Sequence, residues 1–420
     1  MTDVEVRKAT RSLPRALTPF RHPSYRRLAV ALVLATFAGG VWVVGLVWEV
    51  IRLGGGPAQL SAVSTAGAVG VLLPALLGGV VADRVPQKLI LVCVAATELI
   101  CMALIALLSF ADLTQLWHLA VVGFVIGTAM AFYYPAYSAW LPALVPEEDL
   151  LAVNGFEGMV RPTIGQAIGP GVAGVVVGIA SPAAALTVAA LSSLAGLVAL
   201  ATVPRTAVRR EEAADSILRD MREGFVYMVR TPWLLATLLF ASLMVFVIMG
   251  PLEVLVPFLV KDKLGGGPRD HALVLAAFGI GGAVGSLTMA SLRMPRRYLT
   301  WMNLMWGVGC LPMVVMGVAT EIWMLVAAAS VLGGLFSAPM VIWGTLLQRR
   351  VPPHLLGRVA SLDFFVSISL MPISMAVAGP VSELIGLRTT FLIAGVVPGV
   401  AAAVAIVAAK LPHDEIAHPL

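Results

Sequence analysis

Six ionisable side chains stand inside long apolar stretches of this 420-residue chain. They are Glu49, Glu98, Glu157, Arg161, Glu253 and Asp363. Ionisable groups in apolar surroundings are costly, so they usually face a partner or a cavity, and a carboxylate there can take up and release protons. All six are therefore candidates for coupling proton movement to another process.

These candidates differ in their sequence neighbours. Glu157 and Arg161 are four residues apart and share one helix face, so they form either a coupling pair or a structural ion pair. Glu98 lies deep in its stretch without a local partner, so burial favours its neutral form. Glu49 and Asp363 lie nearer the ends of their stretches, within reach of interfacial water.

An aromatic stripe indicates a second kind of chemistry, the binding of a bulky ligand. Tyr133, Tyr137 and Trp140 recur at i, i+4 and i+7, which places two hydroxyl groups and an indole N–H on one helix face. Further side chains that could add adaptable apolar surface are Trp42, Met244, Phe246, Met249 and Trp343. Such walls suit varied amphipathic ligands, and the alternative is packing or lipid contact.

The composition identifies the elements that carry these residues. Hydrophobic residues make up 59% of the chain and charged residues 12%, against roughly 25% charged in soluble proteins. The apolar runs do not alternate as barrel strands do, so we expect an all-α integral membrane protein. The twelve expected transmembrane helices cover about 28–51, 58–82, 88–110, 114–143, 151–179, 182–203, 232–260, 270–292, 297–319, 322–347, 357–383 and 387–410.

The one long polar segment divides the chain into two six-helix halves. The expected parts are a tail at 1–27, a first half at 28–203, a central loop at 204–231, a second half at 232–410 and a tail at 411–420. A shift of 206 residues places Gly127 on Gly333 and Glu157 on Asp363, so the halves are expected to be pseudo-symmetric copies of one unit. Halves related in this way place a binding site between them, near mid-membrane.

The distribution of basic residues predicts the orientation. With both tails in the cytoplasm, 22 of the 28 Lys and Arg residues fall in cytoplasmic segments, as the positive-inside rule requires. The net charge of +5 is therefore assigned to topology and not to a nucleic-acid partner. The six His residues show no zinc-site spacing, and no nucleotide-binding loop or nucleophile elbow is present, so we expect no metal, no cofactor and no enzyme activity.

The loop after the second span carries a motif, from Gly78 to Lys88. It resembles the signature of the major facilitator superfamily, and the matching residues are Gly79, Asp83, Arg84 and Lys88. Pro86 and Gln87 depart from the pattern, and the copy in the second half has Leu292 where an acid would stand. The resemblance implies a gate in which Asp83 meets the start of the eleventh span near Arg358.

The fifth span carries a glycine–proline motif at Gly165, Gly169, Pro170 and Gly174. It resembles the motif of antiporters, drug exporters in particular, and small residues there permit close helix packing. The whole chain resembles the branch that holds enterobactin exporters and the macrolide and tetracycline efflux proteins. It departs from many drug–proton antiporters because the fourth span carries no arginine.

The resemblance implies a secondary active efflux transporter that works by alternating access. It would export amphipathic drugs or siderophore-like compounds in exchange for protons, with the proton gradient as its energy source, as a monomer in the bacterial cytoplasmic membrane. The alternative on the same fold is a lipid or lysolipid flippase or a proton-coupled importer.

Overall fold

The computed structural model describes residues 15–75, 77, 81, 84–206 and 217–419, and this part of the chain contains helices and no strands. The first six spans are built from α1 Pro23–Arg52, α2 Pro57–Leu72, α4 Gln87–Phe110, α5 Leu116–Trp140, α6 Glu147–Val160 with η3 Arg161–Ile168 and α7 Gly169–Ile179, and α8 Pro182–Ala201. The second six are α10 Pro232–Gly250 with η4 Pro251–Leu255, α11 Val256–Phe258 and η5 Leu259–Lys263, α12 Pro268–Ser291, α13 Tyr298–Val308 with α14 Pro312–Val318, α15 Ile322–Arg350, α16 Pro353–Ser369 with α17 Met371–Ile385, and α18 Leu387–Ala408.

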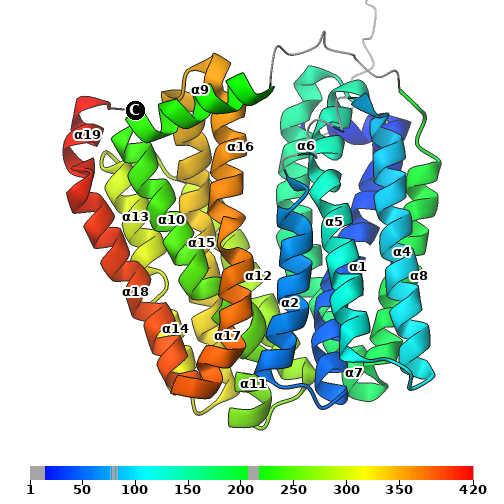
Figure 1. Cartoon of the computed structure of the whole chain (residues 1–420). Coiled ribbons are helices and arrows are strands. Elements are labelled where there is room, and N and C mark those ends of the chain that lie inside the picture. Colours follow the sequence, from blue (N-terminus) through cyan, green and yellow to red (C-terminus); the bar gives the residue numbers. More distant parts are fainter. Residues whose placement is uncertain (1–14, 76, 78–80, 82–83, 207–216, 420) are drawn as a thin grey trace, which may run out of the picture.

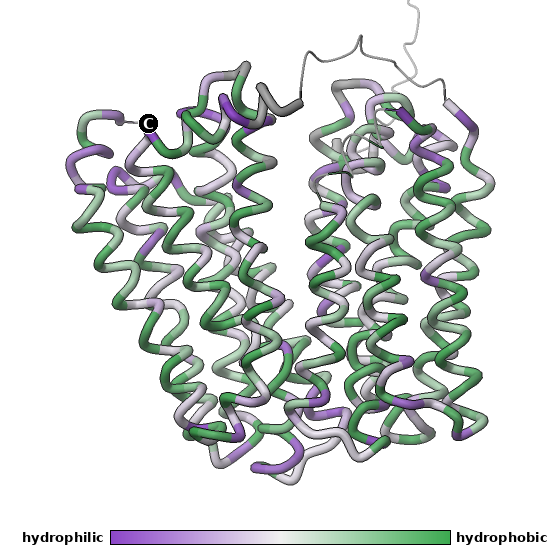
Figure 2. The backbone as a smooth tube through the Cα atoms, in the orientation of Figure 1, coloured by the Kyte–Doolittle hydropathy of each residue, from purple (hydrophilic) through white to green (hydrophobic). Residues whose placement is uncertain are grey.

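Eleven of the described helical segments are long and apolar enough to cross a membrane. The shorter apolar helix α2 takes the place of the remaining span, so the predicted twelve-helix membrane fold is confirmed. Proline occupies the first turn of α1, α2, α8, α10 and α12, where its fixed φ favours helix initiation and its missing N–H costs nothing. Figure 2 shows hydrophobic residues along the helices and hydrophilic residues gathered at the two ends of the bundle.

Three elements lie outside the spans at one end of the bundle, which we call the terminal end (Figure 1). They are η1 Arg15–Arg21, α9 Ile217–Arg230 and α19 Leu411–Ala417. The opposite end, here the far end, carries the tight turns at 53–56, 180–181, 264–267 and 386. The charge pattern of the central loop is compatible with a surface helix or a solvated linker, and α9 is a surface helix there, whereas the helix α19 in the last segment was not predicted.

The two halves use glycine in the same way. A Cβ on Gly127 of α5 would collide with the carbonyl oxygen of Gly67 in α2, and a Cβ on Gly333 of α15 would collide with that of Phe278 in α12. Gly127 and Gly333 are the residues that the 206-residue shift superposes. The close pairs α2–α5 and α12–α15 are therefore equivalent contacts in the two halves.

The halves contact each other at the far end and diverge toward the terminal end (Figure 1). Helix α2 packs on α17, and α7 and η3 pack on α12. The far-end side chains of the first half share one apolar cluster with the whole second half, while the terminal-end side chains of the first half form a cluster of their own. This arrangement is closed at the far end.

Candidate functional site

Glu157 is the centre of a polar group inside the first half. Its Oε2 lies 3.7 Å from the guanidinium of Arg161, the next turn of the same span. The Arg161 side chain is 45% exposed and stands over the ring of Tyr134 at 5.4 Å. The structure therefore brings together the two residues that the sequence places on one helix face, and it joins an exposed cation to a buried acid.

Tyrosines surround the buried side of Glu157. Tyr25, Tyr133 and Tyr137 all lie close enough to Glu157 to interact with it electrostatically. The rings of Tyr133 and Tyr137 stack with centroids 5.8 Å apart. Sequence analysis did not select Tyr25 as a site residue, because a tyrosine at the start of a span is usually an anchor at the membrane interface.

Glu98 faces a separate internal cavity between α1, α4, α5 and α8. The cavity is lined by Leu28, Leu91, Tyr133, Ser193 and other residues, and it has about 20 Å³ of space for the centre of a water molecule. That space is large enough for one water. Among the described residues Glu98 forms no ion pair, as its isolated position in the sequence predicts.

In the second half, the structure joins two candidates from different predicted roles. The indole Nε1 of Trp343 in α15 donates to Oδ2 of Asp363 in α16 at 2.9 Å, and Ser367 donates to Oδ1 at 3.3 Å. The Trp343 ring also contacts Trp233 and Trp306 edge-on. Asp363 is thus a hydrogen-bonded carboxylate beside an aromatic cluster.

The other two acids occupy contrasting places. Glu49 is fully buried and accepts two hydrogen bonds from Arg52, at 2.9 and 2.8 Å, while Arg52 also binds Asp112 at 2.9 Å. This ion pair ties the end of α1 to the turn between α4 and α5, a structural role. Glu253 lies in η4 with an exposed side chain, and it forms no ion pair within the described part of the chain.

Most of the candidate cavity residues pack inside the halves in this conformation. Trp42, Tyr137, Trp140, Met244 and Trp343 are buried, and Tyr133, Phe246 and Met249 are partly buried. Trp140 donates from Nε1 to Oγ1 of Thr206 at 2.8 Å, which fixes the end of α5 to the segment after α8. The aromatic stripe therefore mainly packs the first half here, and its contact with substrate stays a prediction.

The residues of the loop motif are described in part. Gly79 and Asp83 lie outside the described residues, and Arg84 is exposed. Lys88 donates to the carbonyl of Ala201 at 2.7 Å, so it neutralises the carboxyl end of α8. Arg358 pairs with Glu223 of α9, which gives the predicted gate cation an acidic partner on the central helix.

The glycine–proline motif makes two different contacts. A Cβ on Gly40 of α1 would lie 2.5 Å from the Gly165 carbonyl oxygen and 2.9 Å from Cδ of Pro170, so this part holds the fifth span against the first. A Cβ on Gly174 would lie 2.5 Å from Cβ of Ala272 in α12, across the boundary between the halves. The motif therefore contributes to the far-end seal.

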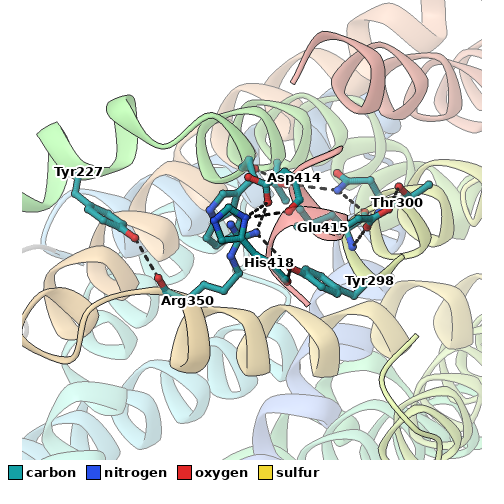
Figure 3. Close-up of polar contacts among 11 residues, drawn as sticks. Tyr227, Tyr298, Thr300, Arg350, Asp414, Glu415 and His418 are labelled. Atoms are coloured by element: carbon teal, nitrogen blue, oxygen red, sulfur yellow. Dashed lines mark hydrogen bonds and ion pairs between the residues drawn. The ribbon is translucent and has the colours of Figure 1, made fainter. Parts of the chain in front are cut away.

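A polar network ties the terminal end of the second half together (Figure 3). Arg350 pairs with Asp414 of α19 and stands 4.7 Å over the ring of Trp233. Glu415 accepts hydrogen bonds from the backbone N–H groups of Leu299 and Thr300 at 2.9 and 3.1 Å. A carboxylate thus caps the amino end of α13, where the helix dipole favours negative charge.

Comparison with known proteins agrees with this architecture. The profile of the major facilitator family described as transmembrane secretion effectors matches residues 14–418. The chain belongs to this family. The resemblance seen in the loop motif is confirmed, and the protein is a multi-pass membrane protein.

Individual relatives and a solved structure are similar to this chain over most of its length. Macrolide efflux protein A of Streptococcus pyogenes is 26% identical over 345 residues, which are 79% of this chain and 83% of that protein. Multidrug efflux pump Tap of Mycolicibacterium fortuitum is 24% identical over 374 residues, 86% of this chain and 90% of that protein. The crystal structure of the nucleoside transporter NupG shares the fold, with a TM-score of 0.73, 15% identity and coverage of 92% and 98% of the two chains.

Proposed function

We propose that this family member is a secondary active efflux transporter that exports amphipathic drugs in exchange for protons. The names of its relatives, macrolide efflux protein A and multidrug efflux pump Tap, support export of drugs. The observation that carries the proposal is the far-end seal between two halves that diverge at the terminal end. Two rigid halves that close at one end at a time are the requirement for alternating access.

The basic residues favour a cytoplasmic terminal end. With that orientation, the described conformation would accept substrate from the cytoplasm, as an exporter must. Carboxylates at depth support proton exchange: Glu98 faces a water-sized cavity, and the exposed Glu253 lies in η4, next to α2 of the other half. An ionisable group in a span normally faces a partner or a watery cavity, so both are candidates for binding protons or a cationic part of the substrate.

Purified protein in proteoliposomes tests this function. A pH gradient is imposed, and erythromycin, tetracycline and a ferric siderophore are offered separately while internal pH and substrate are followed. Exchange predicts that protons move only when a substrate moves, and that they move in the direction opposite to the substrate. Proton and substrate movement in the same direction would identify an importer, and redistribution of labelled lysolipid without a drug response would identify a flippase.

The matched control is Glu49→Gln, because Glu49 is neutralised by Arg52 in a structural pair. It should affect the amount of folded protein and not the ratio of protons to substrate. Glu253→Gln should change that ratio or the preference for cationic substrates. If both variants have the wild-type ratio, Glu253 is excluded from coupling.

A further inference from the structure

The acid of the second half, Asp363, has an aromatic neighbour that corresponds to one beside the acid of the first half. The 206-residue shift that relates the halves places Glu157 on Asp363, and it also places Tyr137 on Trp343. In the first half, Tyr137 of α5 interacts with Glu157 of α6. In the second half, the indole Nε1 of Trp343 in α15 donates to Oδ2 of Asp363 in α16 at 2.9 Å. Each half therefore sets an aromatic donor on one span against a carboxylate on the next.

A third residue, one turn after the acid, differs between the halves. In the first half it is Arg161, whose guanidinium lies 3.7 Å from the carboxylate of Glu157. The same shift places Arg161 on Ser367, whose hydroxyl donates to Oδ1 of Asp363 at 3.3 Å. Both acids lie about 15 Å along their helices from the terminal end. Two equivalent sites at equal depth thus carry a cation in the first half and a neutral hydroxyl in the second.

This difference leaves the carboxylate of Asp363 without a compensating charge. The pair of Glu157 with Arg161 has no net charge, and a proton on Glu157 would leave the cation unbalanced. An ionised Asp363 accepts two hydrogen bonds but forms no ion pair within the described part of the chain. A single charge in a membrane span is costly, and neutral hydrogen-bond donors offset only part of that cost. Binding one proton removes it.

The hydrogen-bond partners of Asp363 suit both of its protonation states. The indole N–H of Trp343 can only donate, and it can donate to Oδ2 of the carboxylate and of the protonated acid. The Ser367 hydroxyl can donate to Oδ1 of the carboxylate, or accept from Oδ1–H of the protonated acid. A proton therefore binds without the loss of either hydrogen bond. Asp363 and Ser367 are both partly exposed, which gives the proton access from water.

Asp363 is set apart from the charged groups of the second half. Helix α16 packs against α2, α9, α10 and α15, and of these α2 and α10 contain no charged residue. The charged or titratable residues of α9, α15 and the rest of α16 with described side chains are Arg222, Glu223, Tyr227, Arg230, Arg349, Arg350 and Arg358. Each of these is exposed, or it belongs to the pair of Glu223 with Arg358 or to the network around Arg350. Among the described residues, the side chains that act on the Asp363 carboxylate are therefore Trp343 and Ser367.

We propose that Asp363 is the proton-binding carboxylate of the second half, and that Ser367 allows this role. In the first half, Arg161 holds the equivalent Glu157 ionised. The proton adds to Oδ1 of Asp363 and no covalent bond breaks. The proposal rests on the proposed proton exchange for its part in transport, whereas proton binding itself needs no drug.

Infrared absorption of the carboxyl C=O group tests the proposal in purified protein without substrate. Between neutral and mildly acidic pH, the wild-type protein should show a band that Asp363→Asn removes and that Glu157→Gln leaves in place. A band that Glu157→Gln removes and Asp363→Asn leaves in place would overturn the assignment.

Exchange of the partner residues is the sharper test. Ser367→Arg places a cation one turn after Asp363, as in the first half, so the Asp363 band should be lost. Ser367→Gln is the matched control, because it adds bulk without charge and should keep the band. Arg161→Ser should give Glu157 a band of its own. Because the Arg161 side chain is 45% exposed, this variant tests the equivalence even if Ser367→Arg fails to fold.

Transport measurements separate this site from the proposed function. In proteoliposomes, Ser367→Arg should lower the ratio of efflux driven by a pH gradient to drug exchange at equal pH. A wild-type ratio together with an unchanged Asp363 band in that variant would overturn the site, even in a protein that exports drugs. Loss of the band in Ser367→Arg, in a protein that moves no drug, would support the site and reject the proposed exporter.

Discussion

Gly379 controls how closely the two halves approach at the far end. A Cβ there would lie 2.6 Å from Cα of Ala58 and would also collide with the Pro57 carbonyl oxygen, where ordinary contact is 3.4–4 Å. Gly379→Ala must therefore separate α17 from α2 by about 1 Å and stretch the 2.7 Å hydrogen bond from its N–H to Oγ of Ser61. Overpacking of this kind costs about 1–3 kcal/mol.

That cost falls on the far-end-closed state alone, because the contact exists only while the far end is shut. With a factor of ten for each 1.4 kcal/mol, the equilibrium should shift roughly 5- to 150-fold toward a conformation that opens the far end. Spin labels at Ala180, in the turn after α7, and at Thr389, in the first turn of α18, report this opening after Cys93→Ser removes the exposed cysteine; both residues are exposed and lie at the far end of opposite halves.

Gly379→Ala should move the population of label distances toward longer values. Gly171→Ala is the control, since a Cβ there meets nothing within 4 Å. An unchanged distance distribution in folded Gly379→Ala would refute the reasoning, as would the same lengthening in Gly171→Ala.

Three further predictions concern the terminal end. The Thr18 hydroxyl and His22 hold the pKa of Asp149 below its usual value of about 3.9. Their hydrogen bonds to Asp149, at the start of α6, are therefore complete above that value and are lost as pH falls through the lowered pKa. Tryptic cleavage near Arg21 at neutral pH should be faster in Asp149→Asn than in wild type, and equal rates would contradict a stabilising role for these hydrogen bonds. Glu415→Gln should destabilise the second half by about 1–3 kcal/mol, because a charged acceptor of three hydrogen bonds at the start of α13 is lost, and thermal unfolding measures this. Asp83→Asn should leave expression intact and abolish efflux. Glu223→Gln should favour closure of the terminal end, because it removes the ion pair between Glu223 and Arg358. Spin labels at that end measure both variants, and a shift of both in the same direction would contradict the gate hypothesis.

The sequence predicts the fold well because membrane spans are local patterns. Twenty apolar residues, a polar interval and a count of basic residues need no knowledge of distant contacts. The equivalence of Gly127 and Gly333 also follows from spacing alone. Two spans are interrupted by π-helical segments, the fifth by η3 and the seventh by η4. These interruptions were not predicted, although Pro162 stands at the start of η3 and Pro251 at the start of η4.

Within the candidate site, the sequence could predict only the contacts that form along a single helix. Glu157 and Arg161 could be paired from their spacing, whereas Tyr25 meets Glu157 across more than one hundred residues of chain. The bond between Trp343 and Asp363 crosses two helices in the same way. Glu49 is two residues from the end of its expected span at residue 51, and its partner Arg52 is the next basic residue, so this structural pair was within reach of spacing arguments.

Small residues make close approaches across the far-end seal, where Gly174 meets Ala272 and Gly379 meets Ala58. A seal of fully buried leucine or phenylalanine side chains would add about 1.5–3 kcal/mol for each one that opening exposes. One elementary charge crossing a membrane potential of 100 mV releases about 2.3 kcal/mol. Each large apolar side chain added at these glycine contacts would therefore raise the work of opening by about as much as one charge transfer releases.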